Sequence, residues 1–457
     1  MKIAVVGAGI SGLSCAWLLS KYSSLASAPQ VTLFEKNDYL GGHTNTIDVH
    51  VDGKSFPVDT GFLVFNDWTY PNFIQMLQHL GVHTAQSDMS FGIKLTDSSG
   101  RSRIEWCGSD DIFTVFAQPS NLFKPAFLGM LWDLLRFNKA ATEMSAHKSK
   151  LSGTLGEYLD THRFGRAFRD WYLVPMAACI WSTPTKQIAN FPLATFITFC
   201  ANHGLISVNN RPKWRTIKGG ARHYVERLRA QLNDIRLNAK ISAIRRKSNG
   251  VGIITASGEE MFDHVVMAGH SDESLALLAD PSSDERRVLR AIRYLPNTAV
   301  LHTDRALLPD RKRAWASWNY HAAFEHQSSQ NDSPVSLTYL LNKLQPLPFT
   351  SPIMVTMNPL QTIDPAKVIK TISYDHPLFL PESVGAKRDL RKLQGTNNTW
   401  FAGAWTRYGF HEDGLMSGIA VARALGAKTP WETNTPAAND LLSAYPGVDD
   451  SLPLAGL

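Results

Sequence analysis

The chain has 457 residues, of which 44% are hydrophobic and 19% are charged. This length and composition allow two or three globular units with large cores and exclude a disordered or fibrous protein. The formal net charge of +6 is small for the length, so the sequence does not predict a nucleic-acid-binding protein.

The first predicted elements are a buried strand and a helix joined by a glycine-rich turn. Lys2–Val6 is a short apolar run typical of a parallel strand, and apolar residues then recur at helical spacing. The turn follows the G-x-G-x-x-G pattern, which allows a tight turn, close approach of a pyrophosphate and close packing of helix on strand. The helix begins near Ser11 and directs its free N–H groups toward the phosphates. The predicted contacts are Gly7, Gly9, Ile10, Ser11 and Gly12.

A second predicted strand ends in Glu35, which Lys36 follows. A carboxylate at this position accepts hydrogen bonds from the ribose hydroxyls of an adenosine and repels a 2′-phosphate. Alone, Glu35 would be interpreted as a solvated strand end. Together with the glycine turn it predicts FAD or NAD rather than NADP, with Glu35 and Lys36 among the cofactor contacts.

A second glycine pair follows, in the order Gly41, Gly42, His43 and Thr44. It lets another stretch of backbone wrap the cofactor's phosphates, which favours FAD over NAD. The arrangement resembles the FAD-binding flavoproteins of the amine oxidase, phytoene desaturase and protoporphyrinogen oxidase group. Many of these carry an arginine after the glycine pair, so His43 is either a phosphate contact or a loop histidine bonded to backbone.

The resemblance extends along most of the chain. It implies that Val58–Phe73 passes beside the flavin ring, with Gly61 and Phe62 nearest. Ile235–Ile244 is predicted to be a strand, and in relatives the backbone of this strand holds the adenine, which implies contacts at Lys240 and Ile241.

Trp400–Leu425 is similar to the C-terminal flavin motif of the group, in which a strand ends, a loop crosses the ring and a helix begins near Asp413. Most relatives have an acid after the glycine of this strand, whereas this chain has Ala404, so that contact is absent or replaced. His411 and Glu412 are the candidates for a catalytic base, and the alternative is a structural role at the helix start. The implied cofactor contacts are Gly403, Ala404, Asp413, Gly414, Leu415 and Met416.

The cysteines indicate a reducing compartment, because four of them are scattered without a C-x-x-C pair. None lies in the C-terminal flavin motif, so the FAD is expected to be noncovalent. No metal-ligand cluster is recognised. The first strand begins at Lys2, which leaves no room for a signal peptide and favours the cytoplasm.

Phe116–Phe137 is the most membrane-like stretch, but its prolines and charges argue against a membrane span. Its helical part is interpreted as a core-facing helix. The alternative is a lid or a shallow contact with the membrane surface that admits an apolar substrate.

The predicted fold is α/β, with a Rossmann-type FAD-binding domain interleaved with a mixed α+β substrate domain. The substrate domain is expected to be largely helical in its first part and strand-rich in its second, where Thr298–Thr303, Ala314–His321 and Val335–Leu341 alternate as strands do. The predicted divisions are 1–75, 205–300 and 395–430 for FAD, 76–204 and 301–394 for the substrate, and 431–457 for a C-terminal tail.

The sequence marks GGHT, DTGF, SWNY and YGFHEDGLMSG are similar to a subgroup described as flavin-containing amine oxidase-like or NAD/FAD-binding proteins. Bacterial relatives often lie beside genes for cyclopropane-fatty-acid-synthase-like methyltransferases, which suggests a fatty acyl substrate. The resemblance thus implies an oxidoreductase, in which flavin N5 takes hydride from an apolar small molecule or lipid. An amine oxidase that releases hydrogen peroxide and a non-enzymatic lipid- or prenyl-binding protein of the same fold are the alternatives. The expected aromatic pocket residues are Trp181, Phe196, Trp318, Tyr320 and Tyr339.

Overall fold

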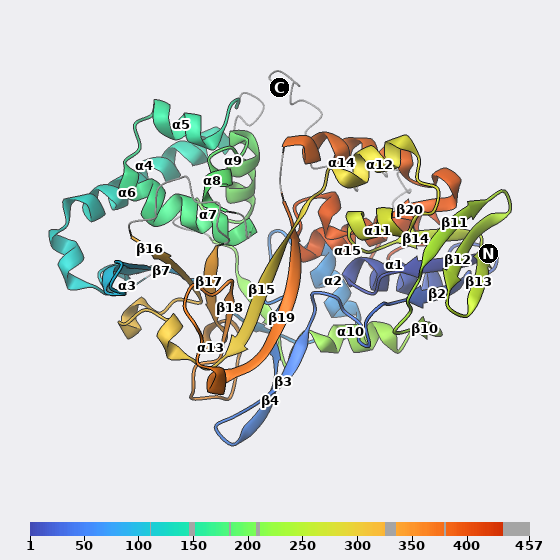
Figure 1. Cartoon of the computed structure of the whole chain (residues 1–457), viewed down its shortest axis with the longest axis horizontal. Helices are drawn as coiled ribbons and strands as arrows, with labels where there is room; N and C mark the ends of the chain where they lie inside the picture. The colour runs from blue at the N-terminus through green and yellow to red at the C-terminus, as the bar shows by residue number, and fades with distance from the viewer. Residues whose placement is uncertain are drawn as a thin grey trace.

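A computed structural model describes residues 1–109, 111–145, 151–181, 184–206, 211–324, 335–378 and 381–432. The fold is α/β and has two parts (Figure 1). One part is built on a parallel sheet near the N-terminus, and the other combines a seven-stranded sheet with a layer of helices. The long strands β15 (Tyr294–His302) and β19 (Val368–Pro377) rise between the two parts (Figure 1).

The parallel sheet has the strand order β10-β2-β1-β14-β20, which puts β1 at its centre. Val5 of β1 lies opposite Leu33 on one side and Val266 on the other. Such near-continuous apolar strands are typical of a sheet that is covered on both faces. The strands are β1 (Lys2–Val6), β2 (Gln30–Phe34), β10 (Asp234–Arg236), β14 (His264–Met267) and β20 (Thr399–Phe401).

Alternate side chains of β1 enter two different cores, as the period of a strand requires. Ile3 and Val5 pack in one core, and Ala4 packs in the other. The first core contains the helices α1 (Ile10–Lys21), α2 (Pro71–His79), α10 (Arg222–Arg229) and α15 (His411–Ala424). The second contains β11 (Ala243–Lys247), β12 (Gly250–Thr255), β13 (Gly258–Phe262), α11 (Ser271–Leu277), α12 (Ser283–Arg290) and α14 (Pro381–Leu393).

The prediction of one strand over Ile235–Ile244 is wrong. β10 ends at Arg236 and β11 begins at Ala243, so Lys240 and Ile241 lie in the loop between them. Asn238 has a φ of +52°, a left-handed conformation that asparagine tolerates and that ends a strand.

The second part is built on the sheet β19-β15-β18-β17-β16-β7-β8. The three segments predicted as strands near residues 298, 314 and 335 supply β15, β16 and β17. The stretch 76–204 is largely helical, as expected, and also supplies the strands β6 (Thr84–Gln86), β7 and β8. The remaining strands are β7 (Phe91–Thr96), β8 (Ser102–Gly108), β16 (Trp318–Ala323), β17 (Ser336–Leu340) and β18 (Met354–Met357).

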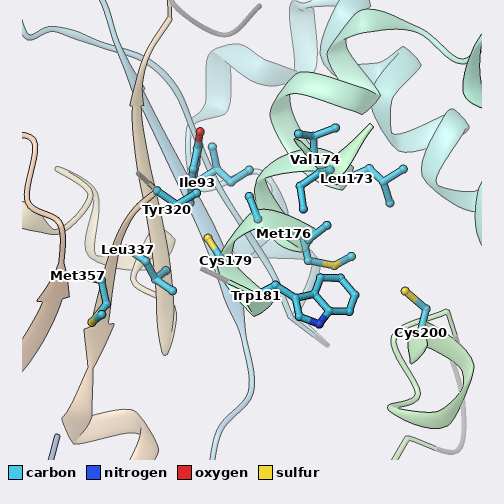
Figure 2. Close-up of a cluster of buried hydrophobic side chains, with 14 of the residues drawn as sticks. Ile93, Leu173, Val174, Met176, Cys179, Trp181, Cys200, Tyr320, Leu337 and Met357 are labelled. Carbon is cyan, nitrogen blue, oxygen red and sulfur yellow. The ribbon is translucent and has the colours of Figure 1, made fainter. Parts of the chain in front are cut away.

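Helices from residues 112–202 cover this sheet and form the largest apolar core with it. Figure 2 shows Trp181 and Met176 of α7 on one side of this core, with Tyr320, Leu337 and Met357 of the sheet on the other. The helices are α3 (Ile112–Val115), α4 (Pro125–Ser145), α5 (Leu155–Thr161), α6 (Arg166–Phe168), α7 (Val174–Trp181), α8 (Thr185–Ile188) and α9 (Leu193–Asn202), with a π-helical turn at Arg169–Leu173.

Two further small sheets and a short helix lie among these elements. The hairpin of β3 (Thr46–Val51) and β4 (Lys54–Asp59) leads to the sheet β5-β9-β6, and α13 (Leu341–Leu344) follows β17. The strands of the second small sheet are β5 (Phe65–Asn66), β6 (Thr84–Gln86) and β9 (Trp214–Ile217).

The expected division into domains stays a proposal. The parallel sheet supports it, since every strand of that sheet comes from the three segments assigned to FAD. Two of the expected boundaries divide structural units. β15 runs across residue 300, and β6, which was assigned to the substrate domain, pairs with β9, which was assigned to the FAD-binding domain. The first residue of the expected tail is held on the fold, since Trp431 stacks on Trp17 with ring centroids 6.2 Å apart. Residues 433–457 lie outside the described residues.

Candidate functional site

The glycine turn between β1 and α1 is tightly packed, except at Gly9, where the backbone is open. Gly7 has a φ of +104°, and its N–H donates to the carbonyl of Phe34 at 2.8 Å. A Cβ on Gly12 would lie 1.9 Å from the Gly7 oxygen, whereas a Cβ on Gly9 would meet no atom within 4 Å. The backbone next to the start of α1 is therefore open at Gly9, as the approach of a pyrophosphate requires.

The second glycine pair lies directly on the first turn. The N–H of Gly41 donates to the carbonyl of Ala8 at 2.8 Å, and both Gly41 and Gly42 have positive φ. A Cβ on Gly42 would lie 3.2 Å from the Cα of Gly9. Two loops far apart in sequence thus present backbone to the same place, which suits a ligand with two phosphates.

Glu35 is buried at the end of β2 beside the first turn. Its carboxylate accepts the N–H of Ala8 at 2.8 Å, and the N–H and side-chain amide of Asn37, each at 2.9 Å. A carboxylate has about four acceptor positions, so one remains for a ribose hydroxyl. Lys36 is exposed and forms an ion pair with Glu273, and its contact with the cofactor stays a prediction.

The loop between β10 and β11 is anchored on the end of β2 through its backbone. The N–H of Asn238 donates to the carbonyl of Asn37 at 2.9 Å, and the N–H of Ala239 donates to the carbonyl of Glu35 at 2.8 Å. Lys240 and Ile241 follow directly, so they lie near Glu35 although they belong to a loop and not to the expected strand. Their contact with the adenine stays a prediction.

The segment beside the expected flavin position is joined to the second glycine loop by a close backbone contact. The N–H of Phe62 donates to the carbonyl of His43 at 2.9 Å, and a Cβ on Gly61 would lie 2.2 Å from that oxygen. Only glycine fits there. The ring of Phe62 stacks on the ring of His411, with centroids 3.8 Å apart.

A chain of side-chain contacts links His411 to the second glycine loop. The Nε2 atom of His411 lies 2.9 Å from the hydroxyl of Tyr224, which lies 2.5 Å from the Oγ1 atom of Thr44. Burial, followed by the neighbouring His43, lowers the pKa of His411 to about 3. A neutral His411 held in this way positions the segments around it.

His43 is surrounded by aromatic and imidazole rings. The ring centroids of Tyr374, His376 and His270 lie 5.1, 5.8 and 6.1 Å from that of His43. Burial and then the two other histidines lower the pKa of His43 to about 3. The side chain is therefore neutral at neutral pH and does not supply the charge of the arginine found in many relatives.

The C-terminal helix α15 packs closely on α1 through small residues. A Cβ on Gly418 would lie 2.3 Å from the carbonyl oxygen of Ser11, and one on Gly414 would lie 2.7 Å from the side chain of Ile10. This packing brings the N-termini of two helices to one place, where both favour negative charge.

The start of α15 is organised by Asp413. Its carboxylate accepts the N–H groups of Phe410 and Tyr408 at 2.9 and 3.2 Å, and it lies 3.4 Å from the Nε atom of Arg407. Leu415 is fully buried in the core, and the sulfur of Met416 lies 3.0 Å from Arg407.

The strand before this helix, β20, ends at Phe401, two residues before Gly403. The N–H of Gly403 donates to the hydroxyl of Ser417 at 2.8 Å, and Ala404 begins a short 3-10 turn, Ala404–Thr406. Ala404 cannot make the side-chain contact of the acid found in most relatives.

Glu412 stabilises the start of another helix. Its carboxylate accepts the N–H groups of Asn72 and Phe73, at 3.0 and 2.9 Å, and the side-chain amide of Asn72 at 2.8 Å. These residues begin α2, so Glu412 satisfies donors that the helix itself leaves free. Burial is the main cause that raises the pKa of Glu412 to about 7. These contacts favour the structural alternative, and catalysis by Glu412 stays a proposal.

The five aromatic residues expected around the substrate belong to the large core between the sheet and the helices. The ring centroids of Trp181 and Phe196 are 6.2 Å apart, and those of Trp318 and Tyr339 are 5.0 Å apart. Figure 2 shows Trp181 and Tyr320 on opposite sides of this core. A role for these residues in substrate binding stays a proposal.

Four of the residues that hold the site together were given no role by sequence reasoning, namely Tyr224, His270, Tyr374 and His376. Tyr374 and His376 alternate along β19 and therefore face the same side of the strand. This alternation is the signal that could have shown them, whereas the contact between Tyr224 and His411 joins segments that no local pattern relates.

The chain is similar to known proteins in both sequence and fold. Residues 10–342 match the family described as flavin containing amine oxidoreductase. No curated protein matches the sequence significantly.

Solved structures share the fold over nearly the whole chain. A fatty acid isomerase from P. acnes that produces CLA has a TM-score of 0.61 at 16% identity, covering 92% of this chain and 98% of that one. A putrescine oxidase bound to putrescine has a TM-score of 0.62 at 14% identity, covering 93% and 99%. Cyclohexylamine oxidase from Brevibacterium oxydans IH-35A has a TM-score of 0.60 at 14% identity, covering 93% and 98%.

Proposed function

Because the chain belongs to the flavin-containing amine oxidoreductase family and is an FAD-dependent oxidoreductase, we propose that its substrate is hydrophobic, with a fatty acyl compound as the first candidate. When bound, the flavin supplies the hydride acceptor at its N5 atom. The protein supplies the binding site, the orientation of the substrate and the exclusion of water.

The residues that would hold noncovalent FAD form one continuous set. The open backbone at Gly9 and the start of α1 suit the pyrophosphate, and the buried carboxylate of Glu35 suits the ribose. The start of α15 lies against that of α1 and would favour negative charge on the flavin. This convergence of distant segments is the observation that carries the proposed cofactor role of the residues.

The apolar core of the second part supports a hydrophobic substrate. Tyr320, Leu337 and Met357 face the helix that carries Met176 and Trp181 (Figure 2). The similar fold of a fatty acid isomerase is compatible with an acyl chain. His411 would keep Phe62 in place through the stacked rings, as a positioning residue.

An amine substrate is the second candidate, and one carboxylate favours it. Asp170 lies on the π-helical turn Arg169–Leu173 beside the large core, with its carboxylate 3.9 Å from Arg166, and burial raises the pKa of Asp170 to about 6 against the effect of the neighbouring arginines. A carboxylate near aromatic rings can attract an alkylammonium group. The family and the putrescine oxidase fold are compatible with this candidate as well.

The two candidates are separated by mixing the yellow holoprotein with fatty acids or with alkyl amines under anaerobic conditions. Bleaching of the flavin absorption by acyl compounds alone supports our proposal. Bleaching by amines, together with formation of hydrogen peroxide in air, would instead establish an amine oxidase. In that case Asp170→Asn should lose both the bleaching and the peroxide.

We further propose that the protein is cytoplasmic and touches the membrane surface. No helix within the described ranges is long and apolar enough to cross a bilayer.

A further inference from the structure

Exposed apolar side chains gather on one edge of the helical part. This apolar edge consists of the outward-facing residues of α3, of the 3-10 turn Pro119–Phe123 and of α4. Phe123 is 85% exposed, Trp132 69% and Phe113 66%. Figure 1 places α3 and α4 in the outer, helical part of the molecule, away from the parallel sheet. The edge is defined by Ile112, Phe113, Leu122, Phe123, Leu128, Trp132 and Leu135.

The helix α4 is apolar on two faces, and only one of them is used by the core. Phe127, Met130 and Phe137 are buried in the large core, where Phe127 lies beside Trp106 of β8. Leu128, Trp132 and Leu135 lie on the outer face. Core packing therefore explains why the inner face of α4 is apolar but does not explain the apolar outer face. Large apolar surfaces that are exposed to solvent commonly mark interaction sites.

Cationic side chains lie beside the apolar edge. The Nζ atom of Lys124 lies 2.8 Å from the carbonyl oxygen of Arg103. After burial, the charges of Arg103 and Arg311 lower the pKa of Lys124, which places three cations close together. The turn Lys312–Ala314 packs against α3 and adds the exposed Lys312 and Arg313.

Asp97 lies 4.0 Å from Arg103, and Asp310 lies 2.9 Å from Lys94, so these carboxylates are paired with other cations. Among the described ion pairs, none involves Lys124, Lys312 or Arg313, which therefore carry the charge of the border. Glu105 is buried 2.8 Å from Arg311, and Asp133 is buried 2.9 Å from Arg136. Asp111 is exposed and accepts the N–H of Phe113 at the start of α3. The edge thus combines protruding aromatic side chains with a cationic border.

We propose that this apolar edge inserts into the interfacial layer of a bilayer that contains anionic lipids. Aromatic and leucine side chains favour the boundary between head groups and acyl chains, and lysine and arginine favour anionic head groups. A second copy of the chain fits less well, because a two-fold contact would bring the two cationic borders together. This inference builds on the membrane contact proposed above and names the residues and the class of lipid involved. It does not depend on which substrate the flavin oxidises.

The test is co-sedimentation of the full-length holoprotein with phosphatidylcholine vesicles, with and without phosphatidylglycerol. The variant Phe123→Glu/Trp132→Glu removes the two most protruding aromatic groups. The matched control, Leu25→Glu/Leu360→Glu, changes two exposed leucines outside the apolar edge. Flavin absorption and thermal unfolding show that each variant is folded.

We expect the wild type and the control to bind the anionic vesicles, and the aromatic variant to bind at least tenfold more weakly. Added salt should weaken wild-type binding, because it screens the cationic border. Absence of wild-type binding, or equal loss in both variants, would overturn the proposal. A stable wild-type dimer that only the aromatic variant dissociates in analytical ultracentrifugation would also overturn it.

Discussion

At the scale of single residues, the site depends on buried polar groups that each serve more than one segment. Glu35 joins the end of β2 to the first glycine turn, and Glu412 joins α15 to α2. His411 contacts Phe62 by stacking and Tyr224 through a hydrogen bond. Substitution at such positions therefore affects binding and stability together.

Glu35→Ala should weaken the binding of FAD about tenfold or more. The change removes an acceptor for a ribose hydroxyl and also leaves the buried N–H of Ala8 without its side-chain partner. Equilibrium dialysis of the apoprotein with FAD measures the effect. Glu259→Ala, at an exposed position of β13, is the matched control, and equal affinities for all three proteins would refute the ribose role of Glu35.

Glu412 should make stability depend on pH. Burial raises the pKa of Glu412 from 4.5 to about 7, so the folded protein holds this proton more tightly than the unfolded chain. The resulting stabilisation is present below the unfolded pKa and is lost as the pH rises to about 7, by about 3 kcal/mol in total.

The check is urea unfolding of wild type and Glu412→Gln at about pH 5 and about pH 8. The variant lacks the titrating group, so its stability relative to the wild type should rise with pH. A difference between the two proteins that stays constant with pH would contradict this expectation. Glu412→Gln also removes one hydrogen-bond acceptor at the start of α2, which lowers the free energy of unfolding of the variant by an amount that does not depend on pH.

At the scale of elements, the sequence predicted those helices, strands and turns whose formation depends on residues close together in the chain. The strand, glycine turn and helix at the N-terminus were predicted because period, glycine positions and the acid at Glu35 agree. The prediction of a strand over Ile235–Ile244 was wrong, because the alternation of apolar residues gives no sign that Asn238 adopts a left-handed conformation and ends the strand. The partners of His411 and Glu412 could not be predicted, since each contact joins segments distant in the sequence.

Gly418→Ala should destabilise the protein by several kcal/mol and reduce its FAD content. The new Cβ would lie 2.3 Å from the carbonyl oxygen of Ser11, so α15 would have to move away from α1. Thermal unfolding and flavin absorption measure both effects.

Gly385→Ala is the matched control within a helix. A Cβ at Gly385 meets no atom within 4 Å, so this change should stabilise α14 by about 0.5–1 kcal/mol. If both variants behave alike, close packing of α15 on α1 does not determine the site.

At the scale of the whole molecule, the proposed FAD site is made by segments from the beginning, middle and end of the chain. Gly9, Ala239 and Gly414 belong to different sequence regions, yet each lies next to the end of the parallel sheet or the start of α1. A ligand that contacts all of these segments stabilises their common arrangement and not one element alone.

FAD should therefore raise the unfolding temperature of the whole FAD-binding part. At a free concentration of about 100 times Kd, one bound ligand contributes about 2.7 kcal/mol, because only the folded state binds it. Calorimetry of the apoprotein with increasing FAD should show the transition moving upward by a few degrees. Glu35→Ala should need a higher concentration for the same shift, since its Kd is larger. If FAD moved the transition of neither protein, the three segments would not be holding a common ligand, and the proposed site would fail even if the fold were correct.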